Sequence, residues 1–332
     1  MERLTVLGAG SWGTTLADIL ARKGFEAVLW ARDPLLAEAI KRERENEPYL
    51  PGVKLSPNLR PTASLEEALS GSSLIVSAVP SHGLRDVFSR ARPFIPKDAI
   101  IVSASKGIEE ETLLTARAVI EDTLRETPHS DISVLSGPTF AKEVSVRLPA
   151  AVCAASRSHE AAERVQRAFS TQYFRVYTNS DIIGVELGGA LKNVIAIAAG
   201  ICDGLALGSN ARAALITRGL AEMSRLGVKM GASPMTFSGL SGLGDLVLTS
   251  TAHLSRNYMV GREIGLGRKL PEITGTMKMV AEGVKTSRAS RALAERQGAD
   301  MPITTEVCRV LYEGKDPRDA VLELMMRGLK VE

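Results

Sequence analysis

Lys192 and Asn193 form a polar pair inside a long apolar stretch and are the side chains best placed to do chemistry. Every other residue between Leu187 and Ile201 is apolar or glycine. A lysine in such surroundings must find polar partners or give up its proton more easily, and either property suits a proton donor. The alternative is a structural lysine that reaches solvent or pairs with a carboxylate.

A second lysine, Lys106, follows a predicted strand at residues 100–104 and precedes Gly107. A cation at the end of a strand could contact both a bound cofactor and an anionic or carbonyl-bearing substrate. A solvated surface lysine is the alternative.

The segment 238–257 carries the residue types of an anion site. It is rich in Gly and Ser, contains Asp245 and Thr249, and ends in Ser255-Arg256-Asn257 at a predicted helix start. An arginine beside free helix-start amides binds phosphate through charge-assisted hydrogen bonds, each worth roughly 1.5 to 3 kcal/mol. Ser255 could equally be no more than the helix cap.

The elements that must position these groups begin with a glycine turn. A short apolar run, residues 4–7, leads into Gly8-Ala9-Gly10-Ser11-Trp12-Gly13, followed by a helical pattern and a second apolar run at residues 26–30. In a dinucleotide-binding turn the first glycine allows the tight turn, the second lets the backbone approach a pyrophosphate, and the third lets the helix pack on the strand. The order of elements therefore favours a dinucleotide site over a purely structural turn.

Arg32 and Asp33 follow the second strand, at the place where a dinucleotide-binding fold contacts the ribose of the cofactor. Asp33-Pro34 is typical of a helix cap followed by proline at the first helical position. We therefore assign Asp33 to the cap and Arg32 to a 2′-phosphate, because a guanidinium there can pair with that group. This predicts NADP(H) as cofactor, with NAD(H) also tolerated.

Strands and helices alternate through the first half of the chain. Ser64-Leu65-Glu66-Glu67 predicts a capping box that opens a helix, and further strands are predicted at residues 73–79, 100–104, 131–135, 150–155 and 173–177. This pattern predicts an α/β fold, a Rossmann-type doubly wound domain over residues 1–181, with ligands beyond the carboxyl ends of the strands.

Residues 182–332 predict an all-helical C-terminal domain. Its first helix spans residues 182–201, and Asp316-Pro317 is expected to open the last helix, which ends near Gly328. The substrate is expected in a cleft between the two domains.

Composition excludes several classes of protein. The 332 residues carry 41 basic and 38 acidic side chains, a net charge of +3 with no long one-sign block, so neither nucleic acid nor an anionic membrane is an expected partner. Cys153, Cys202 and Cys308 are scattered and odd in number, which fits buried, reduced thiols and neither a disulfide framework nor a metal site.

Two features bear on location. Met1-Glu2-Arg3 is followed directly by the first strand, so we expect no leader and a cytoplasmic protein. Segment 182–201 is long and apolar enough to raise the question of a membrane span. Glu186, Lys192 and Asn193 lie within it, so a helix buried in a domain is the better hypothesis and no membrane insertion is expected.

These motifs, in this order, resemble the bacterial NAD(P)-dependent glycerol-3-phosphate dehydrogenases over essentially the full length. Those that carry the resemblance are the Gly8–Gly13 turn, Val79-Pro80-Ser81-His82, Ser105-Lys106-Gly107, Ser136-Gly137-Pro138-Thr139-Phe140-Ala141, Ala190-Leu191-Lys192-Asn193, the stretch 208–214, Gly244-Asp245-Leu246, Ser255-Arg256-Asn257 and the stretch 281–286.

The resemblance implies the reversible reduction of dihydroxyacetone phosphate to sn-glycerol 3-phosphate, a precursor of phospholipids, and a role for each matching residue. Lys192 would transfer the proton, with Lys106, Asn193 and Asp245 orienting the exchange. The substrate would contact Lys106, Gly137, Thr139, Lys192, Asp245, Ser255, Arg256 and Asn257. The cofactor would contact Gly8, Gly10, Ser11, Trp12, Gly13, Arg32, Lys106, Ala141, Arg256, Val280 and Glu282.

Two departures from the family pattern keep small polar side chains: Ser209 stands where relatives commonly carry Asp, and position 139, here Thr, varies between Ser and Thr. Two other functions stay open: a β-hydroxyacid or 6-phosphogluconate type dehydrogenase, and a catalytically inactive NADP(H) sensor. The sequence also leaves the oligomeric state open, with a homodimer as one alternative.

Overall fold

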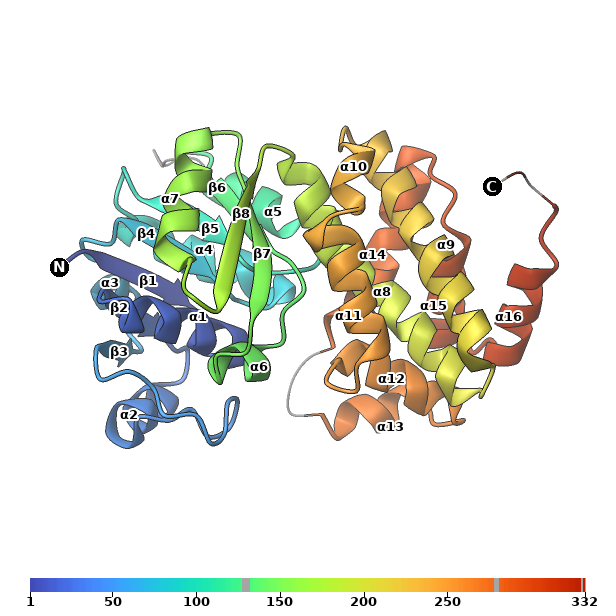
Figure 1. Cartoon of the computed structure of the whole chain (residues 1–332), viewed down its shortest axis with the longest axis horizontal. Helices are drawn as coiled ribbons and strands as arrows, with labels where there is room; N and C mark the ends of the chain where they lie inside the picture. The colour runs from blue at the N-terminus through green and yellow to red at the C-terminus, as the bar shows by residue number, and fades with distance from the viewer. Residues whose placement is uncertain (127–131, 278–280, 330, 332) are drawn as a thin grey trace. The chain divides into compact units, whose positions relative to one another are not determined.

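The computed structural model describes residues 1–126, 132–277, 281–329 and 331. The chain forms two compact units (Figure 1). The first consists of Met1–Lys106 and Ala116–Val185, and the second of Gly107–Thr115 and Glu186–Glu332.

An eight-stranded sheet forms the centre of the first unit, in the order β3-β2-β1-β4-β5-β6-β7-β8. Its strands are β1 (Arg3–Leu7), β2 (Glu26–Trp30), β3 (Leu59–Thr62), β4 (Leu74–Ser77), β5 (Ile100–Ser103), β6 (Ile132–Ser136), β7 (Ala150–Ala155) and β8 (Phe174–Asn179). The first six are parallel, β7 is antiparallel to β6, and β8 is parallel to β7. The loops after β1 to β6 therefore leave from one edge of the sheet, the edge where doubly wound folds bind ligands.

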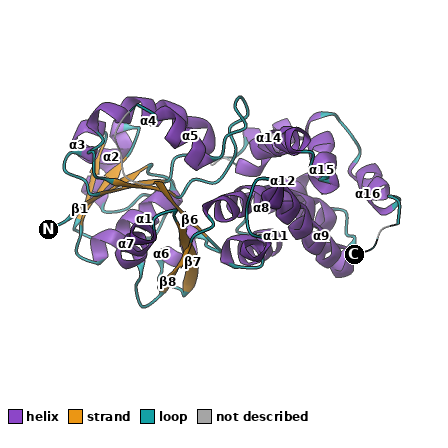
Figure 2. Cartoon of the chain, turned by 90° about the horizontal axis from the view of Figure 1, so that it is seen from above, coloured by secondary structure: helices purple, strands orange, loops and turns teal. Residues whose placement is uncertain are grey.

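Helices cover both faces of this sheet (Figure 2). One layer contains α1 (Ser11–Arg22), α6 (Ala141–Ser145) and α7 (His159–Phe169), and the other contains α3 (Leu65–Leu69), α4 (Leu84–Ala91) and α5 (Ala116–Thr123). The helix α2 (Pro34–Glu43) connects β2 towards β3. Strands covered on both faces need continuous apolar runs, such as Leu74-Ile75-Val76, which is fully buried.

The described residues of the second unit form helices without strands. They are α8 (Ile182–Gly204, whose first turn belongs to the first unit), α9 (Gly208–Lys229), α10 (Pro234–Phe237), η3 (Leu240–Gly244), α11 (Asp245–Thr251), α12 (Arg256–Gly265), α13 (Leu270–Gly275), α14 (Glu282–Gln297), α15 (Pro302–Tyr312) and α16 (Pro317–Met325). The most apolar window of α8 is 94% buried inside the protein, so the core-helix hypothesis is confirmed.

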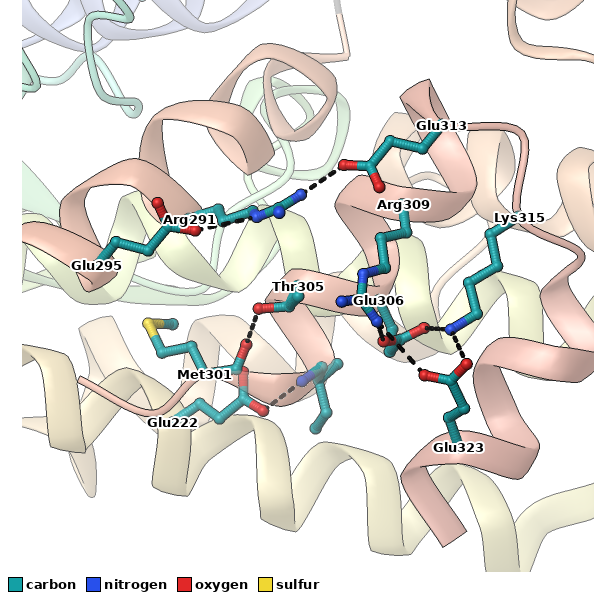
Figure 3. A network of polar contacts seen from close by, with 11 residues as sticks. Glu222, Arg291, Glu295, Met301, Thr305, Glu306, Arg309, Glu313, Lys315 and Glu323 are labelled. Atoms are coloured by element: carbon teal, nitrogen blue, oxygen red, sulfur yellow. Dashed lines mark hydrogen bonds and ion pairs between the residues drawn. The ribbon is translucent and has the colours of Figure 1, made fainter. Parts of the chain in front are cut away.

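A buried carboxylate joins two helices of this unit. Glu222 of α9, labelled in Figure 3, accepts hydrogen bonds from the backbone N–H groups of Ile303 (2.5 Å) and Thr304 (3.2 Å) at the start of α15. These are amides that a helix start leaves without partners, so the glutamate acts as a cap from another helix. Burial outweighs these hydrogen bonds and raises the pKa of Glu222 to about 7.

The last helix is joined to α15 by ion pairs. Lys315 lies 2.6 Å from Glu306 and 2.7 Å from Glu323, and Arg309 contacts the same two carboxylates (Figure 3). Glu323 is largely exposed, so water weakens its share of the network.

Most of the predicted elements are confirmed. The predicted strands coincide with observed ones to within a few residues, and Asp33 and Asp316 cap α2 and α16 through the N–H groups of Leu35 and Arg318. The α/β Rossmann-type fold followed by a helical part is confirmed, as are buried, free cysteines.

Three details differ. The edge strand β3 was not predicted, because it is short, half exposed and contains Pro61. Ser64 caps α3 by accepting from the N–H of Glu67, as predicted. The Glu67 side chain, however, accepts from the Thr62 hydroxyl and not from the N–H of Ser64, so the capping box is incomplete. The last helix ends at Met325, before Gly328.

Candidate functional site

The glycine turn leaves space for a ligand beside one of its three glycines. A Cβ atom on Gly13 would lie 1.9 Å from the Gly8 carbonyl oxygen, and Gly8 has φ +109°, so the fold itself requires both residues. A Cβ atom on Gly10 would meet nothing within 4 Å. Packing therefore does not explain Gly10, whereas close approach of an outside group does.

The start of α1 is also open to a ligand. Gly10 is the N-cap of this helix and has no side chain with which to cap it. The first-turn amides, beginning at the half-buried Ser11 and Trp12, thus carry the partial positive charge of a helix start with no capping oxygen. This donor set fits the pyrophosphate of a dinucleotide.

Asp33 is the predicted helix cap, and Arg32 beside it is exposed. The Asp33 carboxylate accepts from the N–H of Leu35 at 2.9 Å and caps α2. Arg32 is exposed and makes no hydrogen bond or ion pair with the residues that the structure describes. Its guanidinium is available to an anion outside the fold.

Lys106, Gly137 and Thr139 come together at the edge of the sheet where β5 and β6 end. The ammonium of Lys106 donates to the Gly137 carbonyl at 3.3 Å, and the Thr139 hydroxyl donates to the same oxygen at 3.2 Å. Lys106 is half buried, so the alternative of a freely solvated lysine is wrong. Close by in sequence, Ala141 opens α6, and its carbonyl accepts from the Thr15 hydroxyl of α1 at 3.3 Å.

The second unit contains a buried cluster around Lys192. Lys192 is 5% exposed; its ammonium forms an ion pair with Asp245, which is fully buried, and donates to the Thr249 hydroxyl at 2.7 Å. The alternative of a lysine paired with a carboxylate thus holds, but the carboxylate is itself a candidate site residue. Thr249 received no role in the sequence prediction, although its i, i+4 spacing from Asp245 on α11 could have indicated one.

Close helix packing brings the parts of this cluster together. Cβ atoms added to Gly200 of α8 and Gly261 of α12 would lie 2.0 Å from the carbonyl oxygens of Tyr258 and Ile197 respectively. One added to Gly188 would lie 2.4 Å from the Ser241 carbonyl oxygen of η3. These glycines let η3 and α12 approach α8 at backbone distance, which brings the residues at their ends beside Lys192 and Asn193.

Asn193 and Asn257 are joined across that crossing. The side-chain amide of Asn257 donates to the side-chain oxygen of Asn193 at 2.8 Å, and its own oxygen accepts from the N–H of Gly283 at 2.9 Å. The pair therefore connects α8, α12 and the start of α14, next to the half-buried Glu282.

Ser255 and Arg256 form the start of α12. Ser255 accepts from the N–H of Tyr258 at 3.2 Å, which confirms its role as the cap. Arg256 is exposed and has no hydrogen-bond or ion-pair partner within the described part of the chain. A guanidinium at a helix start is a suitable group for binding phosphate. Val280, a predicted cofactor contact, lies outside the described residues.

Comparison with known families decides the relationship. Residues 3–162 match the NAD-dependent glycerol-3-phosphate dehydrogenase N-terminus, and residues 181–322 match the C-terminus of the same family. The chain belongs to this family. The NAD(P)-dependent glycerol-3-phosphate dehydrogenases are oxidoreductases, so the resemblance stated from the motifs is confirmed.

Full-length relatives are similar in sequence and structure. The NAD(P)+ glycerol-3-phosphate dehydrogenase of Citrifermentans bemidjiense is 57% identical over 331 residues, covering 100% of this chain and 99% of its own. That of Geobacter sulfurreducens is 55% identical over 331 residues with the same coverage. The crystal structure of glycerol-3-phosphate dehydrogenase from Coxiella burnetii has a TM-score of 0.94 at 40% identity and covers 98% of this chain and 99% of its own.

Proposed function

We propose that this member of the family catalyses the reversible reduction of dihydroxyacetone phosphate to sn-glycerol 3-phosphate with NADPH, and with NADH as a second cofactor. The observation that carries the proposal is the buried ammonium of Lys192, held between Asp245 and Thr249 beside the paired side chains of Asn193 and Asn257. A water-excluded cation of this kind suits proton transfer to an oxygen that becomes negative.

Lys192 is the proposed proton donor in the reduction. As C2 of the substrate accepts a hydride, its oxygen develops negative charge, and the ammonium donates a proton to it. The Asp245 carboxylate pairs with that ammonium before the step. The Thr249 hydroxyl accepts from Lys192 and donates to Asp245 at 3.3 Å, which fixes the direction of the ammonium.

Arg256 and the start of α12 are the proposed phosphate site. The guanidinium supplies two or more donors, and the N-terminal amides of α12 add to them. The Asn257 amide uses one of its two hydrogens in the bond to Asn193 and can donate the other to the substrate. Ser255 caps the helix as an acceptor, so its hydroxyl hydrogen can also be donated to the substrate. Binding energy at the phosphate, remote from C2, orients the reacting carbonyl.

The first unit is the proposed cofactor site. Gly8, Gly10 and Gly13 with the amides of Ser11 and Trp12 would hold the pyrophosphate, and Arg32 the 2′-phosphate. When bound, the reduced nicotinamide supplies the hydride.

Further contacts are proposed for residues of both units. Lys106, Gly137 and Thr139 would contact the substrate, with Lys106 also at the cofactor. Ala141, Arg256, Val280 and Glu282 complete the proposed cofactor contacts.

The test is an assay of the purified protein with NADPH and dihydroxyacetone phosphate, followed by the loss of nicotinamide absorbance. Turnover with this ketone, and none with a β-keto acid or with 6-phosphogluconate and NADP+, is the expected result. Turnover of a hydroxyacid pair instead would identify the other type of dehydrogenase. NADPH binding without turnover of any of these substrates would identify a sensor.

We also propose a cytoplasmic homodimer that supplies phospholipid synthesis. Support for self-association comes from Leu322 and Met325 of α16 and its C-cap Met326, which are 60–77% exposed and follow the i, i+3, i+4 spacing of one helical face. Sedimentation at micromolar protein concentration should give twice the 35.5 kDa chain mass, and a monomer would contradict this part of the proposal.

A further inference from the structure

A loop between α2 and β3, residues 44–58, is fastened along α1 at several points; we call it the strap. The N–H of Ser56 donates to the Asp18 carboxylate at 2.7 Å. Arg22 donates to the carbonyl of Lys54 at 2.6 Å. Asp18 and Arg22 lie in the second half of α1, away from the glycine turn.

The remaining point of attachment, Asn46, lies at the glycine turn itself. Asn46 is fully buried, and its Nδ2 atom donates to the carbonyl of Ala9 at 2.9 Å and to the Thr14 hydroxyl at 2.7 Å. A carbonyl only accepts hydrogen bonds, so the Ala9 contact requires the nitrogen, and not the oxygen, of the amide at this position.

These two contacts tie the middle of the glycine turn to the first turn of α1. Ala9 lies between Gly8 and Gly10, and Gly10 has no protein atom within 4 Å of its would-be Cβ. Thr14 stands in the first turn of α1, directly after the amides that would face a pyrophosphate. One side-chain amide therefore joins the glycine turn to the start of α1.

We infer that Asn46 is a positioning residue for the dinucleotide: it holds Ala9 and the start of α1 so that their amides converge on the pyrophosphate. The inference rests on the proposed use of NAD(P)H and adds a residue that does not itself contact the cofactor. Donors held in place before binding cost less ordering when the ligand arrives, so loss of Asn46 weakens cofactor binding without altering the chemical step.

The experiment compares Asn46→Ala with a matched control, Asp18→Asn. Both changes remove or weaken buried attachments of the strap to α1, but only Asn46 contacts the turn. The dissociation constant of NADPH is measured by nicotinamide fluorescence without substrate. The KM of dihydroxyacetone phosphate and kcat are then measured at saturating NADPH.

We expect Asn46→Ala to raise the NADPH dissociation constant about ten- to hundredfold, the equivalent of two lost hydrogen bonds. The substrate KM and kcat should stay within about threefold, because the cofactor is saturating. Asp18→Asn should lower the unfolding midpoint and leave the NADPH dissociation constant within about twofold. An unchanged constant in Asn46→Ala, or an equal rise in Asp18→Asn, overturns the inference.

Thr14→Val keeps the test decisive if Asn46→Ala does not fold. It removes one of the two contacts with little change in shape, so the NADPH dissociation constant should rise about three- to tenfold, and no rise overturns the inference. In the double variant Asn46→Ala/Thr14→Val, the Thr14 change should add little to the rise in the NADPH dissociation constant. The hydrogen bond between Asn46 and Thr14 is already absent once Asn46 is replaced. Failure of the proposed function is seen separately, as wild-type protein that binds NADPH but does not reduce the ketone.

Discussion

Replacement of Lys192 by methionine separates the chemical role of the buried ammonium from its structural role. Methionine has nearly the same length and fits an apolar site, but it has no proton to donate. In the described structure Lys192 is the cation paired with Asp245, which is fully buried. The change therefore removes the proposed proton donor and leaves a buried carboxylate without its ion pair to Lys192.

Two effects of different size are expected. Loss of a general acid lowers kcat about 10²- to 10⁴-fold. Breaking a buried ion pair by removing one partner lowers the free energy of unfolding by about 3 to 5 kcal/mol, since the remaining charge is uncompensated. NADPH affinity should change by less than about threefold, because the glycine turn and Arg32 belong to the other unit.

The double variant Lys192→Met/Asp245→Asn distinguishes the two effects. It removes both charges, so most of the lost unfolding free energy should return, while kcat stays as low as in Lys192→Met. Unfolding is followed by far-UV circular dichroism, since both tryptophans, Trp12 and Trp30, lie in the first unit and their fluorescence does not report on the second. Turnover is followed by nicotinamide absorbance at saturating substrates.

Recovery of kcat together with stability in the double variant would refute the reasoning, since it would make Lys192 a structural residue. A kcat of Lys192→Met within tenfold of the wild-type value would do the same.

Three further perturbations test other parts of the molecule. Arg32→Asp should lower the ratio of kcat/KM for NADPH to kcat/KM for NADH about tenfold or more, because it replaces a donor for the 2′-phosphate by a carboxylate that repels it. An unchanged ratio contradicts the assignment of Arg32 to the 2′-phosphate. Arg256→Met should raise the KM of dihydroxyacetone phosphate about ten- to hundredfold while the free energy of unfolding changes by less than about 0.5 kcal/mol, because Arg256 makes no hydrogen bond or ion pair with the described residues. A stability loss with unchanged KM argues against a phosphate site. The pKa of Glu222 is raised to about 7 in the folded state, above its ordinary value of 4.5, so its contribution to stability is present below about pH 4.5 and is lost as the pH rises through about 7. Glu222→Gln should therefore flatten the fall in unfolding free energy between about pH 5 and pH 8, measured by circular dichroism, and an equal slope in both proteins would show that another group titrates.

Much of the fold could be predicted from local sequence patterns. Caps such as Asp33-Pro34 and Asp316-Pro317, the glycine turn and the apolar runs of the strands are each set by hydrogen bonds or packing within a few residues, so the sequence alone shows them. The strand β3 and the incomplete box at Ser64 were missed or misjudged where neighbours from elsewhere in the chain changed the local preference.

In the candidate site, too, some features follow from local sequence and others depend on residues far apart in the chain. The sequence by itself determined which side chains are available: a lysine in an apolar helix, an arginine at a helix start, three spaced glycines and a second lysine beyond a strand. Their residue types and local spacing were enough to indicate a dinucleotide and a phosphate.

Only the tertiary structure decided which of them meet. Lys192 pairs with a carboxylate 53 positions away, Asn193 with an amide 64 positions away, and Asn46 reaches back 37 positions to the glycine turn. These contacts depend on how helices cross, at glycines where backbones touch, and on where a loop returns along α1. No short-range pattern records such distances, because the energy that selects them comes from packing of whole elements rather than from neighbours in the chain.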